Sequence, residues 1–209
     1  MKCILIGGGG HGRVLWEAVN DFRPGVLVGV LDSQPGLKNF GEVPVLGGDE
    51  LLPGLRAQGF THFIIGVGSS KNCTRRAELY VKARKAGLEA LSVIHPTAWI
   101  AHSAEVAAGC QILARAVVNT GAKLGGHVLV NSAAVVEHDC IVGAHTHIAT
   151  GAVLCGDVRV GELSHIGAGA VVRQGIRIGA RALVGAGAVV VKDVPEGAVV
   201  MGVPAREVV

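Results

Sequence analysis

A histidine flanked on both sides by carboxylates is the first chemical signal in this sequence of 209 residues. Glu137, His138 and Asp139 follow one another directly. A neutral imidazole, with an ordinary pKa of about 6.5, can accept a proton near neutral pH, and a neighbouring carboxylate fixes its tautomer and raises its basicity. His138 is therefore a candidate general base. A histidine on a solvent-exposed turn is the alternative that the spacing alone leaves open.

A glycine-rich loop near the start of the chain is the second signal. Gly7, Gly9 and Gly12 match the GxGxxG spacing of dinucleotide-binding loops, between an apolar run and a predicted helix. Backbone amides at such a helix start can hold a phosphate. Asp32 closes the next apolar run at the distance, about 20 residues, where a carboxylate reads a ribose hydroxyl. A plain tight turn is the alternative, but Asp32 favours a phosphate-bearing ligand. An NAD oxidoreductase would need a longer domain and a second catalytic region.

A repeat of six residues fills the second half of the chain. Every sixth residue from Ile94 to Val190 is Ile, Val or Leu, without insertion. This period fits neither an α-helix, which repeats every 3.6 residues, nor a strand, which repeats every 2 residues. It is the hexapeptide pattern of a parallel β-helix. A small residue such as Ala98 or Cys110 commonly follows four places later and turns the corner, and a glycine such as Gly143 often follows the branched residue directly. Three hexads make one triangular coil, and a spacing of about 4.8 Å gives a stack about 25 to 30 Å tall.

The first part of the chain predicts a small α/β unit. Its apolar runs over 2–6, 26–31, 61–67 and 88–93 read as strands of a parallel sheet, and residues 13–19 and 72–86 read as helices. We expect the basic side chains of the second helix to form a solvated face; they are Arg75, Arg76, Lys82, Arg84 and Lys85. The sequence thus predicts a Rossmann-like domain over 1–93 and a β-helix over 94–209.

A zinc site is the competing chemistry in the repeat. His102 and His138 lie two predicted coils apart on one face, as do two ligands of γ-class carbonic anhydrases. A third ligand would stand five residues after His138, but that residue is Gly143. His145 and His147 do not match the spacing of the zinc ligands. We therefore expect no metal.

Composition excludes several classes of function. The net charge is +3, without a basic run that would bind nucleic acid, and no apolar stretch reaches the length of a membrane span. Residues 1–6 are too short an apolar start for a signal peptide. The 5 cysteines form no CxxC pair, which favours reduced thiols in the cytoplasm, with Cys110 and Cys140 as small corner residues.

These motifs together resemble the left-handed β-helix acyltransferases that acetylate nucleotide-linked amino sugars or sialic acid. The resemblance covers nearly the whole chain and rests on the glycine loop with His11, the Leu31-Asp32 strand end, the Gly66-Val67-Gly68 turn, the run from Asn131 to Cys140, and the Gly202-Val203-Pro204-Ala205 tail. It implies a left-handed coil and an acetyltransferase that uses acetyl-CoA as acyl donor, in bacterial glycan biosynthesis.

The resemblance also implies a role for individual residues. His138 would be the general base and Asp139 its polarising partner. The nucleotide sugar would be held by Gly9, Gly10, His11, Asp32, Ser33 and Gly68. The thioester end of acetyl-CoA would meet His147, and its pantetheine arm would run along Ala168 and Ala186. Some relatives have a second acid where this chain has Ser33, so the nucleotide stays open.

The expected reaction is direct attack of a sugar 4-amino group on the thioester, without an acyl-enzyme, in a homotrimer whose neighbouring copies complete the site. Three alternatives remain: O-acetylation of sialic acid or another sugar hydroxyl, a non-catalytic nucleotide-sugar-binding protein, and a zinc lyase. The sequence leaves open the sugar epimer and the length of the acyl donor.

Overall fold

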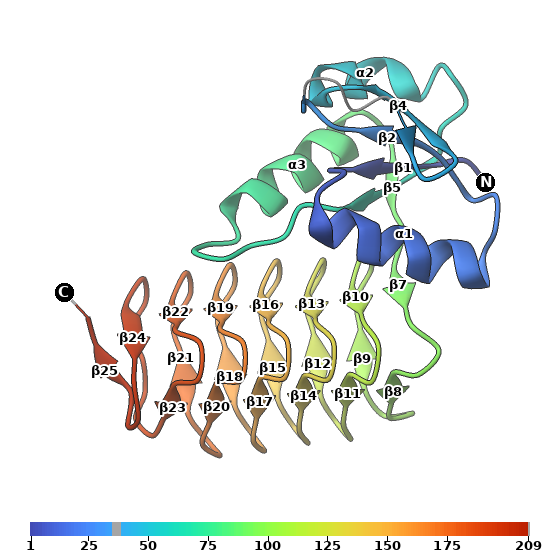
Figure 1. The fold of residues 1–209 in the computed structure, drawn as a ribbon. Helices are drawn as coiled ribbons and strands as arrows, with labels where there is room; N and C mark the ends of the chain where they lie inside the picture. Colours follow the sequence, from blue (N-terminus) through green and yellow to red (C-terminus); the bar gives the residue numbers. More distant parts are fainter. Residues whose placement is uncertain (35–38, 209) are drawn as a thin grey trace. The chain divides into compact units, whose positions relative to one another are not determined.

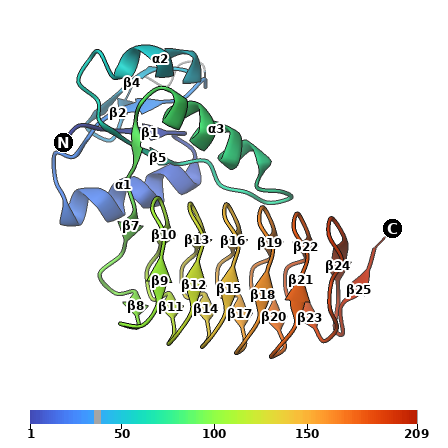
Figure 2. The same ribbon diagram turned by 180° about the vertical axis from the view of Figure 1, so that it is seen from behind.

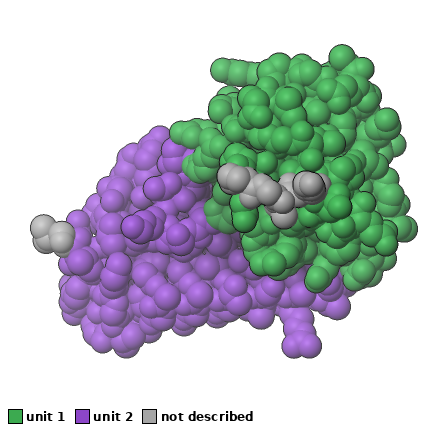
Figure 3. Space-filling model, turned by 45° about the horizontal axis from the view of Figure 1, so that its top comes forward, with its two compact units in different colours: residues 1–68, 75–93 green, residues 69–74, 94–209 purple. Residues whose placement is uncertain are grey.

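The computed structural model describes residues 1–34 and 39–208 (Figure 1). They form two compact units, coloured separately in Figure 3. Unit 1 comprises residues 1–68 and 75–93, and unit 2 comprises 69–74 and 94–209. The segment Ser69–Thr74 therefore belongs with the repeat region, although it lies inside the N-terminal part of the sequence. None of the helices in the described ranges is long and apolar enough to cross a membrane.

Unit 1 is built on a sheet with the strand order β3-β4-β2-β1-β5-β6. The pairings from β4 to β6 are parallel, and β3 runs antiparallel to β4. Its elements are β1 (Cys3–Ile6), α1 (Gly10–Phe22), β2 (Leu27–Leu31), β3 (Asn39–Phe40), β4 (Val43–Gly47), the 3-10 helix η1 (Asp49–Leu51), α2 (Leu52–Leu55), β5 (His62–Ile65), α3 (Thr74–Lys85) and β6 (Glu89–Ala90). The fully buried β1 has the apolar sequence expected of a central parallel strand.

One expectation for α3 is wrong. Arg76 is completely buried rather than part of a solvated face, and its guanidinium donates a hydrogen bond to the Val67 carbonyl (2.7 Å). Arg76 shares the inward face of the helix with Leu79 and Ala83, at the i, i+3, i+7 spacing of one helical stripe. The charge is accommodated because its planar donors reach a backbone carbonyl at the end of β5.

Unit 2 is a left-handed parallel β-helix of two-residue strands (Figures 1 and 2). Its three sheets form the faces of a prism, and we name each by its outward residues. The histidine face contains β7 (Val93–Ile94), β10 (Gln111–Ile112), β13 (Leu129–Val130), β16 (His147–Ile148), β19 (His165–Ile166), β22 (Leu183–Val184), β24 (Val199–Met201) and β25 (Arg206–Glu207). The valine face contains β8 (Trp99–Ile100), β11 (Val117–Val118), β14 (Val135–Val136), β17 (Val153–Leu154), β20 (Val171–Val172) and β23 (Val189–Val190). The arginine face contains β9 (Glu105–Val106), β12 (Lys123–Leu124), β15 (Ile141–Val142), β18 (Arg159–Val160) and β21 (Arg177–Ile178).

The predicted hexad positions line the core of the prism. From β8 to β20, the second residue of each strand pairs with its equivalent 18 residues on, as Val130 pairs with Ile148 and Ile148 with Ile166; in the last coil the spacing shortens to 16, as Val184 pairs with Val200. These side chains and the small corner residues form one buried cluster. Ile94 is the exception: it is 49% exposed, because it begins the run and the first coil has no coil before it.

The corners repeat a left-handed backbone conformation. It is taken by glycines such as Gly121 (φ 69°) and Gly151 (φ 65°), but also by Asp139 (φ 60°) and His145 (φ 61°). The glycines that follow the branched residues serve a different purpose. A Cβ on Gly143 would lie 2.5 Å from the Glu162 nitrogen of the next coil, so these positions need glycine because neighbouring coils approach closely.

The C-terminal end of the prism has a different strand pairing. β24 adds to β22 in parallel, as every earlier strand of the histidine face does, but β25 then runs antiparallel to β24. The chain therefore folds back over the edge of its last coil.

Candidate active site

His138 and Asp139 form a hydrogen-bonded pair at the corner that joins the valine face to the arginine face. The His138 Nδ1 lies 2.9 Å from the Asp139 Oδ2, and the side chains are 51% and 66% exposed. The hydrogen bond to Asp139 raises the pKa of His138, and the charges of Asp139, Glu137 and Asp157 act in the same direction. Because Nδ1–H donates to the carboxylate, Nε2 is left as the acceptor for a proton.

Glu137 has a different role from Asp139. Its Oε2 accepts a hydrogen bond from the Asn119 amide (3.0 Å) and another from the backbone N–H of His138 (3.1 Å). Glu137 thus holds the backbone of the corner, and Asp139 holds the ring.

The coils on either side provide space for this pair. A Cβ on Gly156, one coil further on, would lie 2.5 Å from the His138 Cε1 and closer still to its Nε2. A Cβ on Gly121, one coil earlier, would lie 2.7 Å from the Asp139 Oδ1. The imidazole therefore lies against the bare backbone of one coil and the carboxylate against that of the other. Sequence reasoning missed both glycines, since each looks like an ordinary corner residue.

The residues expected to bind the coenzyme lie at another corner of the prism. Ala168 and Ala186 occupy equivalent positions in successive coils, where the histidine face turns into the valine face, and the Gly187 N–H donates to the Ala168 carbonyl (2.8 Å). His147 stands in β16 on the histidine face. The valine face separates these residues from His138, so one chain does not bring the base and the expected coenzyme residues together.

His147 is engaged within the chain. It is buried, its Nδ1 lies 2.7 Å from the Ser69 Oγ, and its Nε2 lies 3.2 Å from the Asn131 Nδ2. Its ring packs edge to face on that of His165, with centroids 4.8 Å apart. A hydrogen bond from His147 to a thioester or an oxyanion would have to replace one of these contacts. Its role toward acetyl-CoA therefore stays a prediction.

The partners of His147 include a segment from the N-terminal part of the sequence. Ser69 contacts His147, and the buried Cys73 thiol donates to the Ser164 carbonyl (3.3 Å). The segment 69–74 is thus fastened to the histidine face at two points. No pattern in the sequence indicates this contact.

The predicted nucleotide loop lies in unit 1 at the start of α1. Gly9 caps the helix and Gly10 begins it, and a Cβ on either would meet nothing within 4 Å. A Cβ on Gly12 would instead meet the Gly7 carbonyl oxygen. Gly12 therefore serves close packing, while Gly9 and Gly10 expose the backbone amides that could hold a phosphate.

Asp32 secures this loop from the end of β2. Its Oδ2 accepts the Gly8 N–H (2.6 Å) and its Oδ1 the Gln34 N–H (2.8 Å). Each oxygen keeps a further lone pair, so the expected contact with a ribose hydroxyl is compatible with this supporting role. Ser33, the next residue, is exposed. On the other side of the loop, a Cβ on Gly68 would lie 3.6 Å from the His11 Cβ, which places these two expected site residues side by side.

A cavity of about 480 Å³ opens beside the glycine loop. Gly9, Arg13, Trp16, Gln34 and Phe40 are among its lining residues. The Trp16 and Phe40 rings meet edge to face with centroids 6.5 Å apart. The cavity combines an aromatic wall, a cation and backbone amides, which are the contacts that a nucleoside diphosphate requires.

The other candidate chemistries find little support. Within residues 1–34 and 39–208, no group of three or more His, Cys, Asp or Glu side chains is placed to hold a metal ion. Cys110 and Cys140 are buried, and burial raises the pKa of each thiol to about 11. Neither would be a thiolate nucleophile at neutral pH.

Comparison with known proteins extends these observations. Residues 2–82 match the family described as the PglD N-terminal domain, and no curated protein matched the chain. PerB from Caulobacter crescentus, crystallised with CoA and GDP-perosamine, is 34% identical, with 100% of this chain and 98% of that chain covered and a TM-score of 0.92. The acetyltransferase domain of PglB from Neisseria gonorrhoeae FA1090, crystallised with acetyl coenzyme A, is 38% identical, with 99% and 98% covered and a TM-score of 0.90. WeeI from Acinetobacter baumannii AYE is 26% identical, with 100% of both chains covered and a TM-score of 0.88.

Proposed function

Because the chain belongs to the hexapeptide-repeat sugar acetyltransferases, we propose that it transfers an acetyl group from acetyl-CoA to the amino group of a nucleotide-linked 4-amino-sugar in bacterial glycan biosynthesis. The observation that carries this proposal is the His138–Asp139 pair, a base with a fixed tautomer, a raised pKa and an exposed Nε2. The whole-length similarity to PerB, which was crystallised with CoA and GDP-perosamine, supports both substrates.

In this mechanism His138 acts as the general base. The neutral sugar amine attacks the thioester carbonyl, the Nε2 of His138 accepts the proton that the nitrogen loses, and Asp139 stabilises the resulting imidazolium. The carbonyl becomes a tetrahedral oxyanion, which backbone amides of the coils would stabilise. Collapse of this intermediate breaks the carbon–sulfur bond and expels the CoA thiolate, which takes the proton from the His138 imidazolium and so restores the neutral base. No acyl-enzyme is needed, and the high pKa of the buried thiols agrees with its absence.

The two substrates are held by different parts of the chain in this proposal. The loop residues Gly9, Gly10 and His11, with Asp32 and Gly68, hold the nucleotide sugar, and Ser33 lies beside them. His147, Ala168 and Ala186 hold the coenzyme. Holding both reactants converts a collision between two molecules into an oriented reaction.

A homotrimer would complete the site. The valine face exposes an apolar ladder of half-buried valines ending in Trp99, which is 53% exposed; the outward residues are Trp99, Val117, Val135, Val153, Val171 and Val189. The corner of His138 borders this face on one side, and the corner of Ala168 and Ala186 borders it on the other. Three copies with their valine faces around a threefold axis would place the base of one copy beside the coenzyme corner of the next.

The test is release of free thiol from acetyl-CoA by the purified protein with UDP-, GDP- and dTDP-4-amino-sugars and with free sialic acid. Thiol release and an N-acetylated product with one nucleotide-linked amino sugar are expected. Release with sialic acid alone would replace N-acetylation by O-acetylation, and no release with any sugar would refute acetyl transfer. Parallel double-reciprocal lines would contradict direct transfer. The free cysteines fit a reducing compartment, so we place the reaction in the cytoplasm.

A further inference from the structure

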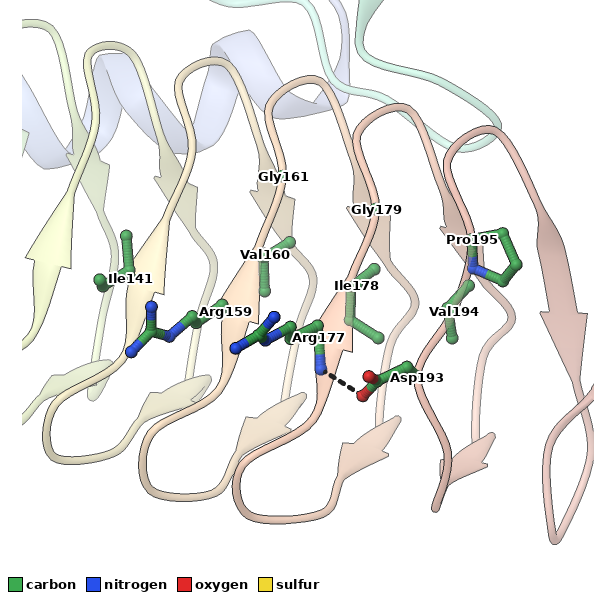
Figure 4. Close-up of a pocket in the computed structure, with 10 residues that line it drawn as sticks. All are labelled: Ile141, Arg159, Val160, Gly161, Arg177, Ile178, Gly179, Asp193, Val194 and Pro195. Atoms are coloured by element: carbon green, nitrogen blue, oxygen red, sulfur yellow. Dashed lines mark hydrogen bonds between the residues drawn. The ribbon is translucent and has the colours of Figure 1, made fainter.

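Two arginines stand directly opposite one another on the arginine face (Figure 4). Arg159 in β18 is the paired neighbour of Arg177 in β21. Paired residues on one face of a sheet lie about 5 Å apart, and like charges at such positions are destabilising. The same face uses a complementary pair elsewhere: Glu105 pairs with Lys123, and their side chains form an ion pair of 2.7 Å. The arginine pair therefore needs an explanation that the fold does not provide.

The acidic side chains nearby pair with only one of the two guanidinium groups in the described part of the chain. Asp157 lies 3.6 Å from the Arg159 guanidinium, in an ion pair whose side chains are 54% and 55% exposed. Asp193 accepts the backbone N–H of Arg177 (2.8 Å) rather than its guanidinium (Figure 4). In the described part of the chain, no carboxylate lies within 4.0 Å of the Arg177 guanidinium. The pair thus offers donors to an anion from outside the chain.

The two arginines line a groove of about 470 Å³. Its lining includes Val160, Ile178 and Pro195 together with the two arginines, so it combines an apolar floor with two cations. Guanidinium groups bind phosphate oxygens with paired, charge-assisted hydrogen bonds, and an apolar floor suits a nucleoside attached to the phosphate. The chemistry of the groove therefore fits a phosphorylated nucleoside.

We propose that Arg159 and Arg177 bind the phosphate groups of coenzyme A, an inference that rests on the proposed function. The arginine face begins at the corner that carries His138. Arg159 and Arg177 stand one and two coils beyond Ile141, the first strand residue after that corner. Two coils correspond to about 10 Å along the prism.

The other wall of the proposed coenzyme site runs in the same direction. Ala168 and Ala186 follow one another by one coil toward the C-terminal end, at the corner that a neighbouring copy would contribute. A coenzyme whose thioester lies at His138 and whose arm extends along these alanines brings its diphosphate and 3′-phosphate toward the two arginines. The copy that supplies the base would then also hold the charged end of the coenzyme.

The test is calorimetric binding of CoA to the full-length protein and to the double variant Arg159→Gln/Arg177→Gln. Hydrogen bonds to charged groups predict about a 10- to 100-fold rise in Kd for the variant, with a weaker dependence of Kd on salt. Lys123→Gln is the matched control, since it removes one positive charge from the same face, and its Kd should stay within about twofold of that of the original protein. Unchanged thermal midpoints and particle sizes would show that the variants keep their fold and assembly.

3′-Dephospho-CoA identifies the phosphate that is bound. If the original protein binds CoA more tightly than dephospho-CoA and the double variant does not, the arginines bind the 3′-phosphate. If the double substitution weakens the binding of CoA and of dephospho-CoA by the same factor, the arginines bind the diphosphate. CoA binding by the double variant at the original Kd would overturn this inference alone, and so would a selective loss of nucleotide-sugar binding. Failure of the original protein to bind CoA would instead refute the proposed function.

Discussion

Replacing Gly156 with alanine should reduce turnover without preventing folding. The backbone of Gly156 is outside the left-handed region, so alanine fits its conformation. The new Cβ, however, would lie 2.5 Å from the His138 Cε1, whereas ordinary contacts begin at 3.4 Å. The imidazole would therefore have to retreat by about 0.9 Å. Because a misplacement of about 1 Å in an active site can cost about 10²-fold in rate, we expect kcat to fall by about 10²-fold.

The measurement is steady-state thiol release by the Gly156→Ala protein across a range of pH. The KM for acetyl-CoA should stay within about twofold, because the change affects the base rather than the expected coenzyme residues. Gly126→Ala is the matched control: its backbone is also outside the left-handed region, and the nearest atom to its new Cβ, the Ala108 oxygen, is 3.7 Å away. This control should keep the original kcat.

A double variant separates an effect through His138 from a general one. If Gly156 acts by positioning His138, adding Gly156→Ala to a His138→Ala protein should cost little further activity, since effects on one shared element are not additive. A Gly156→Ala protein with the original kcat would refute the reasoning, and so would a full additional loss in the double variant.

Four other predictions follow from the same geometry. His138→Ala should lower kcat by about 10²- to 10⁴-fold, as measured by thiol release, with the Kd of CoA by calorimetry nearly unchanged; retained turnover would remove His138 from the mechanism. Asp139→Asn should lower the pKa of His138, because the hydrogen bond and charge of Asp139 raise it. His138 must be neutral to accept a proton, so the rise of kcat with pH should move to lower pH in this variant; a rise at the original pH would contradict the assignment. Val153→Glu on the valine face should give a particle of 21.3 kDa by light scattering, whereas an unchanged assembly would exclude that face as the contact. Arg76→Met should lower the free energy of unfolding by about 1 to 3 kcal/mol, because the Val67 carbonyl loses the hydrogen bond that Arg76 donates, as measured by denaturant unfolding; a variant of equal or greater stability would contradict this.

The sequence predicts the fold of the repeat well because the period itself encodes the geometry. Each branched residue points into the core of the prism, and Val130, Ile148 and Ile166 stack as their spacing of 18 residues requires. The limits of the pattern are at its ends. Ile94 matches the period but is exposed, because burial depends on a neighbouring coil that the pattern cannot report.

Charge patterns were a poorer guide than apolar patterns. Arg76 looks like its basic neighbours in the sequence, and only the packing of α3 reveals that it is buried. β3, β4 and α2 were not predicted, since the residues between the second and third apolar runs carry no clear period. No residue of β4 (Val43–Gly47) is buried, so this strand lacks the continuous apolar run that identified β1 and β5.

The sequence indicated the candidate base but not the residues that surround it. The adjacent carboxylate marks His138 as a candidate base in the sequence, although a histidine on an exposed turn fits the same spacing. The contact between His138 and Gly156 depends on which residues stack 18 positions apart at a corner, and the glycine has no chemistry to attract notice. The contact of Ser69 with His147 joins positions far apart in the sequence, and no periodic pattern could indicate it.

The antiparallel return of β25 has a consequence for growth of the solenoid. A stack of parallel coils ends in unpaired backbone groups that could accept another chain end to end, as in a fibre. β25 occupies that edge on the histidine face, and its outward residues, Arg206 and Glu207, are exposed and charged. β25 thus covers the last parallel strand of the histidine face, and we expect a protein shortened at residue 202, which exposes β24, to associate end to end in light scattering.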